Sequence, residues 1–473
     1  MEEKSIIDMD ATALASSIQN HDMTSVEAVT AFIKHILENN PEINAMVEDR
    51  FEKALEEATE MDSMLERNEI KGPLHGVPIS IKESVHVADM KTTGGLEHRQ
   101  DLISKDDAEI VTRLKNAGAI ILGKTNTPAL SFCQETENKL YGRTNNPWDV
   151  SRTAGGSSGG EGALLAIGGA AAGIGSDIGG SIRFPAHFNG VIGFKPGMYQ
   201  VSTTGHFPHV INPLQERMMT VGPMGRSVQD MRLLYQILSG SSLEQKKLQH
   251  FRIEILPGNI DYPLSQKTKE ILDQLQLFLE KIYSTKRAIP PYFKNSALIW
   301  QEIMSIEGSK LIELEAYNND RSHVYTSFFK EKLTQRTKIH PYLSWAIMGA
   351  KMFRPSLKRI REIEATLEQG DELLASYLKN RLLIFPVYHS GALPHGQVFK
   401  EIFSIRKTFL QYMPYTAYAN VWGLPSLTVP VGVDENNMPV SVQIMSTNGN
   451  EDALFRLGRL IEKKFRGYVR FRK

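Results

Sequence analysis

The hydrophobic and polar positions near the N-terminus follow the periodicity of helices. Thr24 and Glu27 form a capping-box pattern, and the apolar residues after them recur every three or four positions, which predicts an amphipathic helix. A second helical pattern begins at Phe51 and is interrupted by the glycines and prolines of GPLHGVP, residues 72–78. Residues 1–70 are therefore expected to form N-terminal helices that lead into the core.

The pattern then changes from helical spacing to the two-residue alternation of strands. In PISIK, residues 78–82, isoleucines alternate with Ser80 and Lys82, which places Lys82 at the end of a predicted buried strand. A helix is expected over residues 107–118, and AIILG at 119–123 predicts a further buried strand. This alternation of helix and strand indicates an α/β fold.

One central segment is rich in glycine. Residues 155–180 contain eleven of the 36 glycines of the chain, interrupted by the small residues 163–172, which predict a helix. Glycine allows another part of the chain or a ligand to approach the backbone closely. The glycine density therefore indicates that another part of the chain, or a ligand, approaches the backbone of this segment closely.

The C-terminal half differs in composition. Residues 241–385 carry dense charge, several helix-like patterns and no glycine cluster, and we expect them to form a variable, helical insertion that faces the substrate. After it, SLTVPVG at 426–432 and MPVSVQIM at 438–445 predict two strands, and the amphipathic run 452–464 predicts a final helix.

Charge and composition exclude several classes of protein. Fifty-four basic side chains balance 54 acidic ones, so no global field attracts nucleic acid. The single cysteine, Cys133, cannot form an intramolecular disulfide or a thiolate metal site, which fits a reducing compartment. The N-terminal residues MEEKSIIDMD contain no apolar run of signal-peptide length, and no stretch reaches the roughly 20 apolar residues of a membrane span. We therefore expect a cytoplasmic protein with no transmembrane helix and no metal.

Three segments carry residues that could do chemistry: GVPISIKES around Lys82, GGSSGG at 155–160 and GSDIGGSIRFPA at 175–186. Each has a structural interpretation when taken alone, because GGSSGG is typical of a flexible linker and a lysine at a strand end commonly reaches solvent. No GK[ST] follows the glycines, which excludes a phosphate-binding P-loop. Together they supply serines and a lysine, and a buried lysine in its neutral form can serve as the base that a serine nucleophile requires.

In their order and wording, these segments resemble the motifs of the amidase signature family. The resemblance implies a Ser-Ser-Lys triad of Lys82, Ser157 and Ser181, in which Ser181 is the nucleophile and Ser157 passes its proton to Lys82. It also implies an acyl-enzyme intermediate, no cofactor, and one α/β/α domain around a large mixed sheet that spans residues 1–473. A cis peptide bond between Gly156 and Ser157 is expected by the same resemblance.

The loop before the proposed nucleophile is expected to stabilise the charge that develops on the carbonyl oxygen. Backbone N–H groups serve this purpose, and the resemblance assigns them to Ile178, Gly179, Gly180 and Ser181. Asp177 and Arg183 are predicted to form an ion pair that holds this loop, and Ser158 is predicted to support the site without reacting. The other candidates nearby are interpreted as packing or surface residues: His75, His86, His187 and Cys133.

The residues around the serines indicate which branch of the family the chain resembles. GGSSGGEGAL, with Glu161, is most similar to the fatty acid amide hydrolase branch, as are NKLYGRTNNPWD at 138–149 and SDIGGSIRFPAHFNGVIGFKP at 176–196. Mammalian enzymes of that branch carry an N-terminal membrane helix, whereas the pattern here predicts none. Two interpretations of the segment 338–361 stay open: a core helix with a solvated face, or a membrane-facing cap that admits lipid-like substrates. Its apolar and basic residues are Tyr342, Leu343, Trp345, Ala346, Ile347, Met348, Met352 and Phe353 with Lys338, Lys351, Arg354, Lys358, Arg359 and Arg361.

Three functions are compatible with these motifs. The leading one is a free-standing amidase that hydrolyses a carboxylic amide, with a lipophilic acyl group as an open alternative. The second is an A-type subunit of a tRNA-dependent amidotransferase, which predicts glutaminase activity and a stable partner. The third is an inactive scaffold, which the presence of all three triad residues disfavours. The predicted partner is a small-molecule amide and not nucleic acid, while a homodimer and a peripheral contact with a membrane stay open.

Overall fold

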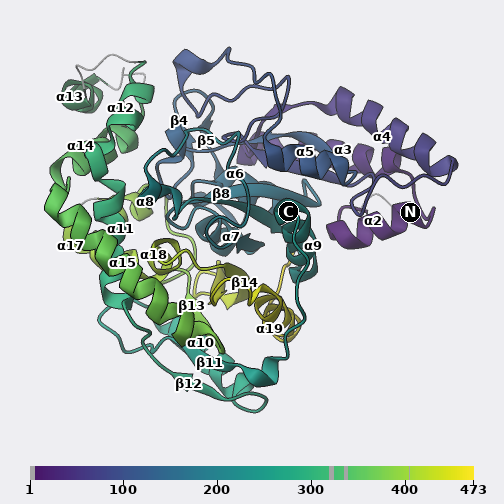
Figure 1. Cartoon of the computed structure of the whole chain (residues 1–473). Coiled ribbons are helices and arrows are strands. Elements are labelled where there is room, and N and C mark those ends of the chain that lie inside the picture. Colours follow the sequence, from purple (N-terminus) through teal and green to yellow (C-terminus); the bar gives the residue numbers. More distant parts are fainter. Residues whose placement is uncertain (1–5, 319–323, 335–338, 404, 473) are drawn as a thin grey trace.

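The computed structural model describes residues 6–318, 324–334, 339–403 and 405–472, and within them the chain forms a large mixed sheet with helices packed around it (Figure 1). In their order across the sheet, its eleven strands are β1 (Met46–Asp49), β3 (Ile120–Thr125), β2 (Pro78–Lys82), β8 (Ala172–Asp177), β10 (Thr220–Gly225), β9 (Ile192–Lys195), β14 (Ser426–Val433), β15 (Pro439–Met445), β13 (Arg381–Pro386), β11 (Arg252–Ile255) and β12 (Thr285–Arg287). Strand β2 is parallel to β3 and β8, and β11 is parallel to β12 and β13, while the other pairs are antiparallel. Two short hairpin-like pairs lie outside this sheet: β4 (Glu137–Asn138) with β5 (Gly142–Arg143), and β6 (Asn145–Asn146) with β7 (Asp149–Thr153).

The helices connect most of these strands. In chain order they are α2 (Ala11–Gln19), α3 (Ser25–Ile43), α4 (Phe51–Glu66), α5 (Glu109–Asn116), α6 (Gly159–Ile167), α7 (Arg183–Asn189), α8 (Pro213–Glu216), α9 (Val228–Ser239), α10 (Gln266–Leu279), α11 (Phe293–Met304), α12 (Lys310–Ala316), α13 (Val324–Thr334), α14 (Pro341–Met352), α15 (Leu357–Leu378), α16 (Gln397–Phe403), α17 (Arg406–Tyr412), α18 (Pro414–Val421) and α19 (Glu451–Lys464). The predicted capping box is confirmed, because the Thr24 hydroxyl accepts from the Glu27 N–H and the Glu27 carboxylate accepts from the Thr24 N–H. Figure 1 shows α2 to α4 at one end of the molecule and α10 at the other.

Strand β9 shows how the layers are arranged, because neighbouring residues of a strand face opposite sides of the sheet. A side chain at Gly193 would meet Ala186 of α7, with 3.1 Å between their Cβ atoms. The next residue, Phe194, packs its ring against Tyr235 of α9 and Phe455 of α19, with ring centroids 5.1 and 4.7 Å apart. Helix α7 therefore covers one face of the sheet, and α9 and α19 cover the other. This confirms the predicted α/β class and its large mixed central sheet.

The helix predicted over residues 163–172 is wrong in its second half. Helix α6 ends at Ile167 with Gly168 in the left-handed region at φ +89°, and Ala172 already begins strand β8. The small residues serve close packing here. A Cβ added at Gly173 would lie 2.0 Å from Glu161 Oε2, so the strand and the helix can only approach each other because Gly173 has no side chain.

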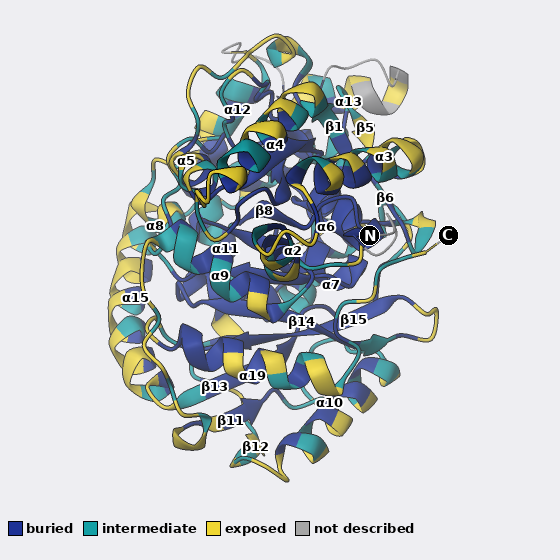
Figure 2. Ribbon diagram, turned by 90° about the vertical axis from the view of Figure 1, so that its right-hand side faces the viewer, coloured by how far each residue is buried: buried dark blue, intermediate teal, exposed yellow. Residues whose placement is uncertain are grey.

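The segment 241–385 contains the predicted helices, from α10 to α15, together with strands of the main sheet. Strands β11, β12 and β13 extend the sheet beyond β15, so the segment is part of the same core as well as a source of surface helices. Figure 2 shows that the long helix α15 exposes one face along its length. Within the described ranges we find no helix long and apolar enough to cross a membrane.

Helix α14 carries most of the apolar residues for which two interpretations were open. Leu343, Ala346 and Ile347 are buried. Leu343 and Ile347 belong to an apolar cluster that also includes Leu130 and Phe207. The outer end of the helix differs, because 70% of the Met352 side chain is exposed. One face of α14 is thus a core face, as the first interpretation held. Lys338 lies outside the described residues.

Candidate active site

Lys82 is the last residue of β2 and is completely buried. Its Nζ lies within hydrogen-bond distance of two hydroxyls, 2.6 Å from Ser157 Oγ and 2.9 Å from Ser176 Oγ. Burial lowers the pKa of Lys82 from 10.5 to about 7, although the negative charges of Asp177, Glu161 and Glu83 act in the opposite direction. Near neutral pH a large fraction of Lys82 is therefore the neutral amine, which can accept a proton.

The glycine-rich segment brings Ser157 toward Ser181. The Gly156–Ser157 peptide bond is cis, which confirms the prediction, and a Cβ at Gly156 would lie 2.6 Å from the Cys133 carbonyl oxygen. The N–H of Ser158 donates to the Ser181 carbonyl at 3.1 Å, so the two serine segments are joined directly. Ser157 and Ser181 line the same cavity, which has a volume of about 310 Å³. The structure thus brings together the three residues predicted as a triad.

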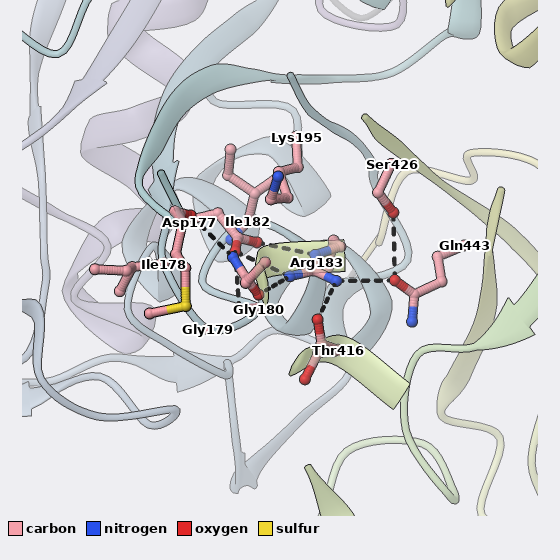
Figure 3. Close-up of polar contacts among 12 residues, drawn as sticks. Asp177, Ile178, Gly179, Gly180, Ile182, Arg183, Lys195, Thr416, Ser426 and Gln443 are labelled. Atoms are coloured by element: carbon pink, nitrogen blue, oxygen red, sulfur yellow. Dashed lines mark hydrogen bonds and ion pairs between the residues drawn. The ribbon is translucent and has the colours of Figure 1, made fainter. Parts of the chain in front are cut away.

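A buried ion pair holds the loop that carries Ser181 (Figure 3). The Asp177 carboxylate accepts from the N–H groups of Gly180 at 2.8 Å and Ile182 at 3.1 Å, and from Arg183 Nε and Nη2, each at 3.0 Å. Arg183 Nη1 donates to the Thr416 carbonyl of α18 at 2.8 Å and to Gln443 Oε1 of β15 at 2.9 Å. Burial alone would raise the pKa of Asp177, but the charge and hydrogen bonds of Arg183 hold it well below its ordinary value.

The backbone of this loop has little room for side chains. A Cβ at Gly179 would lie 2.6 Å from the Trp300 ring, and the Trp300 indole N–H donates to the Ile178 carbonyl at 2.7 Å. Gly180 has φ +101°, a conformation that favours glycine. Its N–H donates to Asp177 Oδ1 at 2.8 Å. The assignment of the Ile178, Gly179, Gly180 and Ser181 N–H groups to the substrate oxygen stays a prediction.

A protein-family model described as Amidase matches residues 27–455 of this chain. The chain belongs to the amidase family. This amidase is 33% identical over 490 residues to fatty-acid amide hydrolase 2-A of Danio rerio, with 97% of this chain and 89% of that protein covered. It is 28% identical to a subunit of the glutamyl-tRNA(Gln) amidotransferase of Carboxydothermus hydrogenoformans, with 96% and 97% covered. A solved structure of fatty acid amide hydrolase superposes with a TM-score of 0.82 at 23% identity, with 98% of this chain and 86% of that chain covered.

Family membership establishes the reaction class of this amidase. It is a serine amidohydrolase that acts on C–N amide bonds. The likeness to the solved fatty acid amide hydrolase shows the same fold. The resemblance to that branch, first indicated by the wording around Ser157 and Glu161, is thus confirmed.

Two residues of the amidase site were not among those predicted from the sequence. Ser176 lies within the GSDIGGS motif, and its place at the end of β8, next to the end of β2, could have indicated contact with Lys82, since the carboxyl ends of adjacent parallel strands meet. His206 lies in a loop outside the three motifs, where no local pattern signals it. Its Nε2 is 3.0 Å from Ser176 Oγ, and both residues line the same cavity as Ser181.

The sequence motif marks Glu161 as typical of the fatty acid amide hydrolase branch, and the structure shows which residues its side chain contacts. Its buried carboxylate accepts hydrogen bonds from Ser80 Oγ at 2.7 Å and Thr125 Oγ1 at 2.8 Å. Burial raises its pKa to about 7, against the effect of these two hydroxyls and of Lys82. Glu161 thereby links α6 to strands β2 and β3, and it follows Ser157 by four residues in the chain.

The histidines and the cysteine in the amidase motifs behave as packing residues where the structure gives their contacts. His75 Nδ1 accepts from the Lys71 N–H at 3.0 Å, and its Nε2 lies 3.0 Å from the Met61 carbonyl. His187 likewise lies between the Ser390 carbonyl and the Ser441 N–H. Cys133 is buried and in the free thiol form. These contacts agree with the structural interpretation of His75, His187 and Cys133.

We expect Arg183→Met to lower the free energy of unfolding of the amidase by about 3–5 kcal/mol, because it leaves the buried Asp177 charge without its partner. Urea unfolding followed by intrinsic fluorescence measures the change. Lys53→Met is the matched control, since the Lys53–Glu56 pair is on the surface and its loss should leave the unfolding curve nearly unchanged. An Arg183→Met variant as stable as the wild type would contradict the role given to this ion pair.

Proposed function

We propose that this amidase hydrolyses amides of long, apolar carboxylic acids, and that Ser181 forms an acyl-enzyme with Ser157 and Lys82 as its proton relay. The observation that carries the substrate class is a second cavity of about 790 Å³, which shares Phe132 and Met304 with the cavity at Ser181. Its other apolar lining residues include Trp300, Trp345, Met348, Phe353, Phe403 and Phe409. A chain attached to a carbonyl at Ser181 can extend past Phe132 and Met304 into an apolar space.

The proposed reaction uses the neutral form of Lys82. As Ser181 Oγ bonds to the carbonyl carbon, its proton passes to Ser157 and the Ser157 proton passes to Lys82 Nζ, which is 2.6 Å away. The electron pair of the C=O bond moves to the oxygen, where backbone N–H groups of the Ser181 loop stabilise the charge. When the C–N bond breaks, Ser157 donates its proton to the leaving nitrogen and regains one from Lys82. Water then attacks the acyl-enzyme and gives its proton to the same relay. The bond to Ser181 Oγ breaks, Ser181 regains a proton from Ser157, and the carboxylic acid is released.

We expect kcat/KM to rise about fourfold for each methylene added to the acyl chain, until the second cavity is full, since a buried methylene contributes about 0.8 kcal/mol. Gly349 lines this cavity, and a Cβ added there meets no atom within 4 Å. Gly349→Phe should therefore fill the space and lower kcat/KM for hexadecanoyl amides while butanoyl amides keep nearly wild-type values. A series of acyl amides assayed with both enzymes measures this.

Gly349→Ala is the matched control, because it makes the same change to the backbone of α14 with a side chain too small to fill the cavity. It should behave as the wild type with every amide. A flat response to chain length, or an equal loss for short and long amides in Gly349→Phe, contradicts the proposed substrate class. Glutamine belongs in the same panel, because turnover of glutamine in preference to acyl amides would support the amidotransferase alternative.

A peripheral contact with a lipid surface is part of this proposal. Met352 lines the second cavity and is 70% exposed, and the basic side chains of Arg354 and Lys358 next to it are exposed as well. Apolar and basic side chains together favour binding to anionic membranes. Such a contact would let a long-chain amide enter the second cavity directly from the membrane on the cytoplasmic side.

A further inference from the structure

We propose that His206 is a positioning residue for the base of this reaction: it fixes the Ser176 hydroxyl as an acceptor for Lys82, and so leaves the Lys82 lone pair facing Ser157. The inference rests on the proposed relay from Ser157 to Lys82. His206 acts on Lys82 only through the Ser176 hydroxyl.

The hydrogen bonds of His206 decide its tautomer. Its Nδ1 lies 3.2 Å from the Pro208 carbonyl oxygen, which can only accept, so the proton is on Nδ1. The other nitrogen, Nε2, is then an acceptor. It lies 3.0 Å from Ser176 Oγ and 3.2 Å from Ser84 Oγ. The nearer hydroxyl, that of Ser176, therefore donates its only proton to His206.

This donation determines what Ser176 can do for Lys82. A hydroxyl that has given its proton to His206 can only accept from Lys82 Nζ, which is 2.9 Å away. A neutral amine has two N–H groups and one lone pair. With one N–H held by Ser176, the lone pair is available to the Ser157 hydroxyl at 2.6 Å. Without His206, the Ser176 hydroxyl is free to donate to the same lone pair, and it then competes with Ser157.

Burial and the charges around it keep His206 neutral throughout this process. Burial lowers its pKa to about 3, and the charges of Lys82, His209 and His86 act in the same direction. Lys82 in turn faces the carboxylates of Asp177, Glu161 and Glu83. His206 therefore acts through its fixed tautomer and does not take up the proton of the reaction.

The test compares two replacements of His206 in the full-length enzyme. His206→Leu removes the acceptor and should lower kcat about 10- to 100-fold with KM within about threefold of wild type, as expected when a reacting group is misdirected. His206→Gln can offer its amide oxygen to Ser176 and its NH₂ group to the Pro208 carbonyl, and should recover most of that loss. Ser84→Ala, which removes the other hydroxyl at Nε2, should leave kcat unchanged.

The pH profile gives a second readout. In His206→Leu the Ser176 hydroxyl can donate to neutral Lys82, which favours the neutral form and lowers the pKa of Lys82 further. The acid limb of kcat should therefore move to lower pH while the plateau falls. A purely structural role for His206 would lower the plateau or raise KM without moving the acid limb in this direction.

The double variant is the sharpest test, because the proposal predicts that one loss relieves the other. Ser176→Ala removes the competing donor, so Ser176→Ala/His206→Leu should match Ser176→Ala and be faster than His206→Leu. If His206→Leu does not fold, His206→Met replaces it in each comparison. Additive losses, a Gln variant as slow as the Leu variant, or a rise in KM alone would overturn the inference.

The failure of this inference can be told apart from failure of the proposed relay. If Lys82→Met keeps wild-type activity, the relay itself is wrong. If Lys82→Met is inactive and His206→Leu has wild-type kcat and pH profile, the relay stands and only the role of His206 falls.

Discussion

Ser181→Ala should lose at least about 10⁴-fold in kcat, because no other hydroxyl of the site is expected to replace the nucleophile. The substrate cavity keeps its shape, so binding of a substrate or product should change little. Steady-state kinetics with an acyl amide measures the loss. A fluorophosphonate should label the wild-type enzyme at Ser181, since its phosphorus centre resembles the tetrahedral intermediate.

Peptide mapping of the labelled protein supplies the control for this result. Ser158 bonds through its hydroxyl to the backbone of Ser176, and Ser158→Ala should still be labelled at Ser181. An adduct found only on Ser157 or Ser158, or an active Ser181→Ala variant, would assign the nucleophile to another residue.

Lys82→Met should lower kcat about 10²- to 10⁴-fold at pH 7, the range associated with loss of a general base. Part of the loss should be recovered in alkali, where hydroxide can remove the proton. As the proposed base, Lys82 must be neutral, and its pKa is about 7, so activity should rise with pH through this value and fall below it. A pH–rate profile of both enzymes with one acyl amide checks each point.

The same substitution should stabilise the protein. The pKa of Lys82 is about 7 in the folded state and 10.5 in its ordinary state, so the unfolded chain binds the proton more tightly. The resulting loss of stability is complete below about pH 7 and disappears as the pH rises toward 10.5. At pH 7, Lys82→Met should therefore unfold with a free energy about 2–4 kcal/mol higher than the wild type, after allowance for its lost hydrogen bonds.

Lys124→Met is the matched control for both effects. Lys124 is a buried lysine on the neighbouring strand β3, its pKa is lowered to about 8 by burial, and its Nζ bonds to the backbone and side chain of the segment 91–92. Its replacement should change stability and leave the pH–rate profile of the wild type. If Lys124→Met moved that profile as Lys82→Met does, Lys82 would not be the base.

The parts of the fold predicted from sequence were those whose signals are local. The alternation in PISIK predicted strand β2 with Lys82 at its end, and the capping box at Thr24 predicted the start of α3. The run 163–172 misled because its small residues were interpreted as one helix, whereas the chain leaves the helix after Ile167 and enters strand β8 at Ala172, where the next residue, Gly173, approaches Glu161 closely. Tertiary packing outweighed the local preference there.

The candidate site was predicted from motifs, and the contacts of Ser176 and His206 were not. The resemblance supplied Lys82, Ser157 and Ser181 as residues, but the link from Lys82 through Ser176 to His206 depends on a loop that no local pattern places beside β2. Likewise, only the structure shows that the Gly180 N–H is taken by Asp177. The first detail depends on hydrogen bonds between segments distant in sequence, and the second depends on the local conformation of the loop.

The ion pair that holds the Ser181 loop also depends on residues made much later in synthesis. Arg183 is satisfied by the Thr416 carbonyl and by Gln443, and strand β9 pairs with β14 at residues 426–428. A chain emerging from the ribosome therefore lacks the Thr416 and Gln443 partners of Arg183 until residue 443 is made. Contacts between such distant segments form slowly, since a long loop must close before they yield any stabilisation. Nascent chains of this enzyme should thus stay inactive until residue 443 can join the sheet.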